Sequence, residues 1–127
     1  MQPYVLVVDD DEAVRLLLLN LLDDEGYLAR GAGDAYEAMD QVATDSPALL
    51  LLDLMMPGVS GVEFLARLRR DPRWADLPVI LLSAHPRLRE IAQDLRVVVA
   101  LAKPFDVALL LDHVALILGP AVPTITD

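Results

Sequence analysis

Five short apolar runs are spaced along the chain, at residues 4–8, 27–32, 49–52, 79–82 and 97–102. Four of these runs are almost entirely apolar instead of alternating with polar residues, which is typical of strands covered on both faces. Segments with helical periodicity lie between them. Repeated alternation of strand and helix predicts an α/β fold, in which a parallel sheet carries helices on both faces.

The predicted helices are marked by apolar residues spaced three and four positions apart. Two of them cover residues 34–44 and 86–94, and another begins after Ser60 as its N-cap and ends before Pro72. The apolar face of the first helix, which ends at Gly26, consists of Val14, Leu17, Leu18, Leu21 and Leu22. That of the last helix consists of Val107, Leu110, Leu111, Val114, Ile117 and Leu118.

The length of 127 residues corresponds to one domain, which we place at residues 1–120, with a short tail at 121–127 and no effector domain. Hydrophobic residues make up 55% of the chain, which excludes intrinsic disorder. The longest stretch without Asp, Glu, Lys or Arg, residues 113–126, falls short of the roughly 18 apolar residues that a bilayer requires. We therefore expect no contact with a membrane.

Charge and cysteine content narrow the functions further. The chain carries 20 acidic and 10 basic residues, a net charge of −10, whereas nucleic-acid-binding domains are normally basic. We therefore expect no nucleic-acid partner and interpret the arginines at 67, 69, 70 and 73 as a solvated helix face. The absence of cysteine excludes disulfides and thiolate chemistry, and together with the lack of a signal sequence it predicts a cytoplasmic location.

Polar residues follow four of the predicted strands directly. Three aspartates at 9–11 come after the first strand, Asp53 after the third, Ser83 after the fourth and Lys103 after the fifth. Ligands of such sheets bind at the carboxyl ends of the strands, so these side chains are expected to meet at one edge. Each residue alone also has an ordinary interpretation, as a helix cap, a turn residue or a solvated charge.

Taken together, the polar set predicts a cation site. Several carboxylates at one edge repel one another and raise each other's pKa unless a cation shares the site. A hard divalent ion such as Mg²⁺ is held by one or two carboxylates, with water and phosphate oxygens completing its shell. Lys103 and Ser83 would then supply a positive charge and a hydroxyl suited to a phosphoryl group.

Four motifs carry a resemblance to a known family. They are VLVVDDDE at 5–12, LLDLMMPG at 51–58 with Gly61 after it, SAH at 83–85 and KPF at 103–105. In this order and spacing they resemble the receiver domains of two-component response regulators, including stand-alone CheY-like receivers. The resemblance covers residues 3–118 and implies a flavodoxin-like (βα)5 three-layer sandwich, with a five-stranded parallel sheet in the order 2-1-3-4-5.

The resemblance also implies a phosphorylation switch and not a turnover enzyme, although the switch promotes its own phosphorylation and dephosphorylation. Asp53 would accept a phosphoryl group from a phosphohistidine of a sensor histidine kinase or histidine phosphotransfer protein. Asp10, Asp53 and the main-chain carbonyl of Met55 would ligate Mg²⁺, and Asp9 would hold a metal-bound water.

The remaining motif residues have implied roles around the phosphoryl group. Ser83, which precedes Ala84, would hydrogen bond to phosphoryl oxygens. Lys103 would pair first with Asp53 and later with the phosphate, and the Lys103–Pro104 bond would be cis.

Ala100 departs from the family pattern, because receivers usually carry an aromatic residue three positions before the lysine. Rotation of that aromatic follows the Ser or Thr hydroxyl in the family. We therefore expect Asp53 to be phosphorylated still, while the change on the face of the fifth strand is small or takes another form.

Four leucines lie off the predicted core faces: Leu16 and Leu19 on the first helix, and Leu109 and Leu116 on the last. Single exposed apolar residues are normal, whereas a contiguous patch indicates a partner surface. By resemblance, the first helix would dock the phosphodonor, and our hypothesis is that Leu16 and Leu19 make this contact. Helices four and five would form a homodimer or output face, and the signal would pass to a downstream protein target by contact.

Two other classes of function stay open at this stage. A Mg²⁺-dependent phosphohydrolase of the haloacid-dehalogenase type would use the aspartates at 9–11 as its nucleophile motif. It would leave Asp53 without a role, and Ala13 stands where that motif needs Thr or Val. A pseudo-receiver would be an interaction module that does not signal by phosphate; Ala100 favours it, while the intact aspartates and Lys103 argue against it.

Overall fold

The computed structural model describes residues 3–56, 58 and 60–120. The expected tail at 121–127 and Pro57 of the second motif lie outside the described residues. Over the described residues, five strands alternate with five helices, which confirms the predicted pattern. The elements are β1 (Val5–Val8), α1 (Glu12–Asp24), β2 (Ala29–Ala32), α2 (Ala35–Thr44), β3 (Leu49–Leu52), α3 (Gly61–Arg70), β4 (Val79–Ser83), α4 (Leu88–Asp94), β5 (Val99–Ala102) and α5 (Val107–Leu118).

The strands form one parallel sheet in the order β2-β1-β3-β4-β5, which is the implied flavodoxin-like order. Val8 at the end of β1 pairs with Leu52 at the end of β3. In the next two strands of the sheet, Ser83 at the end of β4 pairs with Ala102 at the end of β5. The residues that follow these four strand ends are therefore brought to the same edge of the sheet.

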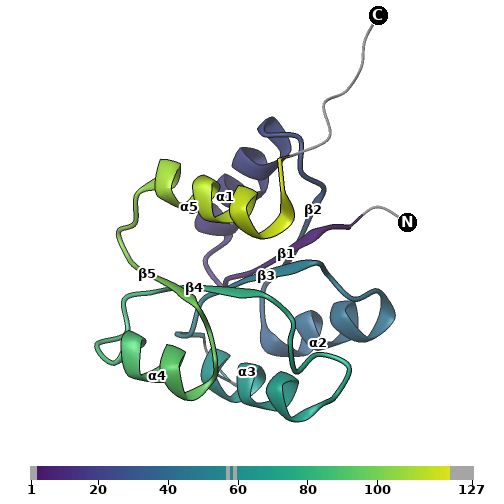
Figure 1. Cartoon of the computed structure of the whole chain (residues 1–127), viewed down its shortest axis with the longest axis vertical. Helices are drawn as coiled ribbons and strands as arrows, with labels where there is room; N and C mark the ends of the chain where they lie inside the picture. Colours follow the sequence, from purple (N-terminus) through teal and green to yellow (C-terminus); the bar gives the residue numbers. More distant parts are fainter. Residues whose placement is uncertain (1–2, 57, 59, 121–127) are drawn as a thin grey trace, which may run out of the picture.

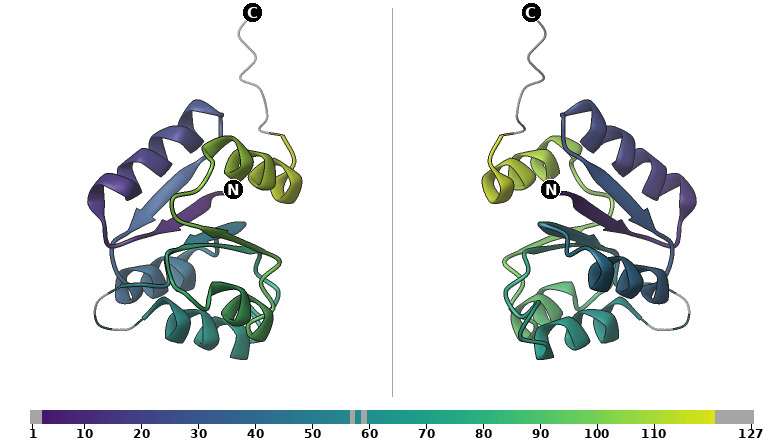
Figure 2. Two further views of the ribbon diagram at one scale, coloured as in Figure 1. Left: turned by 90° about the vertical axis from the view of Figure 1, so that its left-hand side faces the viewer. Right: turned by 90° about the vertical axis from the view of Figure 1, so that its right-hand side faces the viewer.

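Helices cover both faces of the sheet and make a three-layer sandwich (Figure 1). The side views show α1 and α5 on one side of the sheet and the other three helices on the opposite side (Figure 2). In β3, Leu49 and Leu51 pack with residues of α1 and α5, whereas Leu50 and Leu52 pack with residues of α2, α3 and α4. All four leucines are buried, which explains why this strand is an unbroken apolar run.

Two strands and one helix, β2, β5 and α4, begin two residues later than predicted. Tyr27 precedes β2 and donates its hydroxyl to the carbonyl of Gly119 at 3.0 Å. Val97 closes the end of α4, because its N–H donates to the carbonyl of Ala92 at 2.8 Å. Pro86 lies before α4 and not inside it. No helix in the described part of the chain is long and apolar enough to cross a membrane.

The apolar face of α1 differs from the prediction at two positions. Leu17 is 52% exposed, whereas Leu19 packs against the buried cluster between α1, α5 and the sheet. Gly31 of β2 accounts for this difference, since a Cβ at that position would lie 3.1 Å from Cδ1 of Leu19. Leu19 fills the space beside the glycine, so the exposed pair on α1 is Leu16 and Leu17 and not Leu16 and Leu19.

Candidate functional site

The polar residues predicted to converge do meet, because their strands end in register. The N–H of Asp53 donates to the carbonyl of Val8 at 3.0 Å, which continues the pairing of β3 with β1 by one residue. The N–H of Lys103 donates to the carbonyl of Ser83 at 3.1 Å and continues the pairing of β5 with β4 in the same way. Asp9, directly after Val8, therefore lies at the same edge as Asp53, Ser83 and Lys103.

Three carboxylates form an acidic cluster at this edge. One oxygen from each of Asp9, Asp10 and Asp53 lies within 4.8 Å of the other two. Asp9 is 2% exposed and Asp53 is 6% exposed, while Asp10 is exposed to solvent. Asp11 has a different role as the N-cap of α1, since its side chain accepts two main-chain N–H groups of the first turn. The helix-cap interpretation therefore holds for Asp11, and the other three aspartates make up the cluster.

Lys103, the only lysine in the sequence, reaches into the acidic cluster. Its Nζ donates to Oδ2 of Asp9 at 3.0 Å and to Oδ2 of Asp53 at 3.4 Å. Burial acts to lower the pKa of Lys103, but its hydrogen bond to Asp9 and the negative charges of both carboxylates hold that pKa above its ordinary value. Lys103 therefore stays protonated and compensates part of the negative charge.

Burial raises the pKa of Asp53 above its ordinary value. The N–H of Met55, which donates to Oδ1 of Asp53 at 3.0 Å, and the charge of Lys103 both oppose this rise, while the charge of Asp9 adds to it. The net rise means that Lys103 and the hydrogen bonds do not fully offset the cost of burying this carboxylate. Buried carboxylate oxygens whose negative charge is only partly compensated are good ligands for a hard divalent cation, so the residues present fit Mg²⁺.

Ser83 is fully buried at the end of β4. Its Oγ accepts the N–H of His85 at 3.1 Å, so it does not cap α4, whose N-cap residue makes no side-chain hydrogen bond. Ala84, the next residue, is exposed. The Lys103–Pro104 peptide bond is cis, as expected. The structure therefore brings these motif residues to the edge that carries the acidic cluster.

Arg15 also contacts the site, although the sequence analysis did not single it out. Its Nη1 donates to the carbonyl of Asp9 at 2.7 Å. Its side chain lies over Gly31 and Gly33, where an added Cβ would come within 3.1 Å and 3.3 Å of Arg15 atoms. The signal in the sequence was an arginine among the leucines of α1, together with two glycines in and after the neighbouring strand.

Gly61 belongs to the second motif, and the structure gives the reason for a glycine there. A Cβ at this position would collide with the carbonyl oxygen of Asp53 and lie 2.6 Å from Cα of Leu54. The N–H of Gly61 donates to the carbonyl of Leu54 at 3.1 Å. The first residue of α3 is therefore packed directly against the main chain that carries Asp53.

Ala100 lies on β5 beside an open groove of about 440 Å³, which His85, Leu88 and Ala102 also line. Residues 100 and 102 point to the same side of the strand, and both are alanines. The position where the family carries an aromatic therefore borders unfilled space close to the end of β4.

Comparison with known proteins identifies the class to which this fold and site belong. The response regulator receiver domain family matches residues 5–115. Sporulation initiation phosphotransferase F of Bacillus subtilis is 34% identical over 109 residues, which are 84% of this chain and 86% of that protein. The DNA-binding dual master transcriptional regulator RpaA of Synechocystis is 37% identical over 118 residues, 91% of this chain. This chain spans about half of that relative, 49% of its length.

A solved structure supports the same assignment. The response regulator TrrA of Thermotoga maritima, in complex with Mg²⁺ and BeF, superposes with a TM-score of 0.81 and 30% identity, covering 91% of this chain and 99% of that one. The chain belongs to the response regulator receiver domain family. It is therefore a phosphorylation-activated signalling switch, and neither the phosphohydrolase nor the pseudo-receiver interpretation is favoured. Receivers bind Mg²⁺ in an acidic pocket, which here corresponds to the aspartate cluster.

Proposed function

We propose that Asp53 is the phosphoacceptor of this receiver. The observation that carries the proposal is the position of Lys103, whose ammonium group contacts Asp53 and Asp9 together, next to Asp10. An oxygen of Asp53 attacks the phosphorus of a donor phosphohistidine, and a P–O bond forms while the P–N bond of the donor breaks. Burial shields this carboxylate from bulk water, and the ammonium group of Lys103 beside it offsets negative charge as the phosphoryl group arrives.

The aspartate cluster is proposed to hold Mg²⁺. Asp10, Asp53 and the main-chain carbonyl of Met55 would be its direct ligands, and Asp9 would act through a water molecule. When bound, the ion neutralises negative charge on the phosphoryl oxygens. Arg15 fixes the carbonyl of Asp9, so the loop that carries two of the aspartates is held in place before any ligand binds.

Lys103 and Ser83 are proposed to bind the phosphoryl oxygens. The ammonium group of Lys103 already lies within hydrogen-bond distance of Asp53 and needs little movement to reach a phosphoryl oxygen on it. The Oγ of Ser83 accepts an N–H from His85, so its own proton is available to donate. Since the chain supplies positioning and charge itself, a small phosphodonor is sufficient, and the same groups assist the later attack of water.

Mass spectrometry of the intact chain, incubated with acetyl phosphate and Mg²⁺, tests the proposal. We expect one added phosphoryl group, which is absent in Asp53→Asn and after chelation with EDTA. Asp40→Asn, on the exposed surface of α2, is the matched control and should be labelled like the natural chain. Label on Asp9 would support the hydrolase-type reaction, and no label on any residue would support a pseudo-receiver.

The phosphodonor is proposed to be a sensor histidine kinase or a histidine phosphotransfer protein that docks on α1. Leu16 and Leu17 are 49% and 52% exposed and form the apolar surface of α1. Leu16→Glu together with Leu17→Glu should slow transfer from a protein donor but leave labelling by acetyl phosphate unchanged. Equal slowing with both donors would mean that the substitutions disturb the site and not the docking.

Helices α4 and α5 are proposed as the homodimer or output face, through which the signal reaches a downstream protein. On α5, Leu109 is 44% exposed and Leu116 is 80% exposed, as predicted. Sedimentation analysis of the chain with and without the phosphoryl mimic beryllofluoride measures the association. If Leu116→Glu leaves a mimic-induced dimer intact, this face is not the one used.

A further inference from the structure

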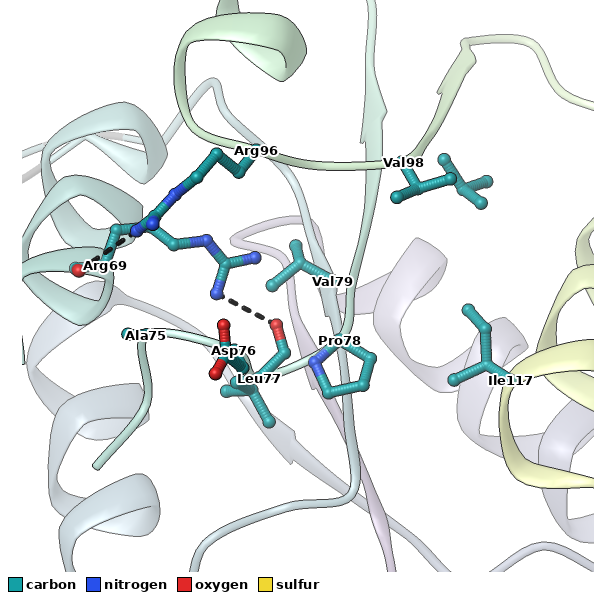
Figure 3. A pocket seen from close by; sticks show the side chains of 10 residues that line it. Arg69, Ala75, Asp76, Leu77, Pro78, Val79, Arg96, Val98 and Ile117 are labelled. Carbon is teal, nitrogen blue, oxygen red and sulfur yellow. Dashed lines mark hydrogen bonds between the residues drawn. The ribbon is translucent and has the colours of Figure 1, made fainter. Parts of the chain in front are cut away.

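A second pocket lies at the opposite end of the sheet from Asp53, where β4 and β5 begin (Figure 3). Its volume is about 390 Å³, which is within the usual range for small-molecule sites. Val79 and Val99, the first residues of the two strands, are among its lining residues. None of the residues proposed for phosphorylation lines this pocket, so the phosphoryl transfer proposed above does not use it.

Arg69 brings an unpaired positive charge into this pocket. Its Nε donates to the carbonyl of Leu95 at 2.9 Å, and its Nη1 donates to the carbonyls of Trp74 and Leu77 at 3.2 and 2.9 Å. Neutral carbonyls satisfy three donors but do not neutralise the charge. Within the described residues, no carboxylate oxygen lies within 4.0 Å of Arg69 and its Nη2 donates to no group. The expectation that Arg69 is part of a solvated face was therefore wrong.

Arg96 adds a second positive charge beside the first. Its Nη2 donates to the carbonyl of Arg69 at 3.3 Å, and both side chains lie on the same side of the pocket (Figure 3). Burial and the charge of Arg96 together lower the pKa of Arg69, and the charge of Asp76 opposes this only in part. Two guanidinium groups thus lie side by side at the pocket, and the charge of Asp76 offsets the effect of burial and of Arg96 on Arg69 only in part, which favours binding of an anion.

The backbone of Arg96 indicates that its side chain is not required for the turn. Its φ is +59°, in the left-handed region that glycine adopts without steric cost, at the end of α4. A glycine would serve this turn better than an arginine. The turn itself therefore does not require an arginine, whose side chain adds a hydrogen bond to the carbonyl of Arg69 and a positive charge beside the pocket.

The side of the pocket opposite the arginines is apolar. Val98 and Ile117 lie across from Arg69, and Pro78 lies between Arg69 and Ile117 (Figure 3). Val98 is 96% exposed, which leaves its methyl groups open to water. A molecule that fits both sides has a negatively charged head for the arginines and an apolar body for the valine, proline and isoleucine.

We propose that this pocket binds a small amphipathic carboxylate, with its head on the free Nη2 of Arg69 and the guanidinium of Arg96 and its body against Val98 and Ile117. Guanidinium groups bind carboxylates through charge-assisted hydrogen bonds, while an apolar chain removes the exposed valine from water. The site is independent of phosphorylation at Asp53.

Titration of the full chain with octanoate, followed by two-dimensional ¹H–¹⁵N NMR, tests the proposal. We expect saturable shifts centred on Val98, Val99 and Ile117, with a Kd on the order of 1 mM for a ligand of this size. Octan-1-ol, which has the body without the charge, should bind about tenfold more weakly. Equal binding of both probes, shifts spread over the surface, or self-association through Val98 without a ligand response would overturn the proposal.

Arg96→Gly is the informative variant, because it removes the guanidinium group and relieves the left-handed backbone. It should fold at least as stably as the natural chain and bind octanoate at least about fivefold more weakly. Arg70→Gln, an exposed arginine on α3, is the matched control and should bind as the natural chain does. Unchanged octanoate affinity in Arg96→Gly would also reject the site. Labelling by acetyl phosphate should persist in both variants, and this measurement reports separately on the function proposed for Asp53.

Discussion

Lys103 lies closer to Asp9 than to Asp53: its Nζ is 3.0 Å from Oδ2 of Asp9 and 3.4 Å from Oδ2 of Asp53. The resemblance had implied a first pairing with Asp53. The lysine instead bridges the two buried carboxylates, and its shorter contact goes to Asp9. The bond to Asp53 is thus the weaker one, which leaves this oxygen easier to release for reaction.

Replacement of the bridging lysine separates its effect on the stability of the fold from its effects on Mg²⁺ binding and on phosphorylation. Lys103→Met leaves Asp9 and Asp53 facing each other without a cation, so the unfolding free energy at pH 7 should fall by about 1–3 kcal/mol. Mg²⁺ binding should tighten, because the ion no longer competes with an ammonium group, while labelling by acetyl phosphate should slow at least about tenfold. Urea unfolding with and without Mg²⁺ measures the first two effects. Weaker Mg²⁺ binding in this variant would contradict the bridging role.

Asp53→Asn should stabilise the fold at neutral pH. Because the pKa of Asp53 is raised in the folded chain, mainly by burial, ionisation at this position favours the unfolded chain. The protonated Asp53 carboxyl group therefore contributes stability that is fully present below the unfolded pKa near 3.8. This stability is lost as the pH rises through the folded pKa and the group ionises. We expect a gain of about 1 kcal/mol at pH 7 in the absence of Mg²⁺, disappearing near pH 3.

The pH dependence of urea unfolding for Asp53→Asn and the natural chain, both in EDTA, gives this difference directly. Asp40→Asn, which changes an exposed carboxylate, should show no gain at either pH. A loss of stability in Asp53→Asn at pH 7 would show that the contacts to Lys103 and Met55 outweigh the cost of burial.

The β3–α3 loop should respond to a single methyl group at Gly61. Gly61→Ala improves helix propensity, yet its Cβ would meet the main chain of Asp53 and Leu54, which cannot move without shifting the acidic cluster. We expect the unfolding free energy to fall by about 1–3 kcal/mol and Mg²⁺ affinity to fall with it. Gly58→Ala is the comparison, because φ at Gly58 is +78° but, among the described residues, no atom lies within 4 Å of the added Cβ. Gly58→Ala should therefore cost only backbone strain and leave Mg²⁺ affinity nearly unchanged.

Local patterns in the sequence were sufficient to predict the alternation of strands and helices and the convergence of the site, whereas the order of the strands came from the family resemblance. Leu49–Leu52 is a strand buried on both faces, and Asp53 directly follows it, so its position at the carboxyl edge needs no long-range information. Contacts between distant segments were not predictable in this way. The position of the Leu19 side chain depends on Gly31 in a neighbouring strand. The guanidinium group of Arg69 donates to main-chain carbonyls up to 26 positions away in the sequence.

Arg15 is predicted to act as a positioning residue for the acidic cluster. Loss of its positive charge alone would strengthen Mg²⁺ binding, whereas loss of its bond to the carbonyl of Asp9 would loosen the loop and weaken binding. We expect the second effect to dominate, so Arg15→Met should bind Mg²⁺ about tenfold more weakly. Isothermal titration calorimetry measures the affinity, and Arg67→Met on the exposed surface of α3 serves as control. Tighter binding in Arg15→Met would mean that only its charge matters.

Ala100 should limit how far phosphorylation changes the surface. Its methyl group has no rotamers, so nothing at this position can move into the groove of about 440 Å³ when the Ser83 hydroxyl turns toward a phosphoryl oxygen. Beryllofluoride with Mg²⁺ should therefore shift NMR resonances around Asp53 and Ser83 but leave those of β5 and α4 nearly unchanged. Ala100→Tyr fills the groove and should extend the shifts to β5 and α4, whereas Ala43→Tyr, on the exposed surface of α2 and away from the groove, should not. A large response of α4 in the natural chain would show that the readout does not require an aromatic side chain at residue 100.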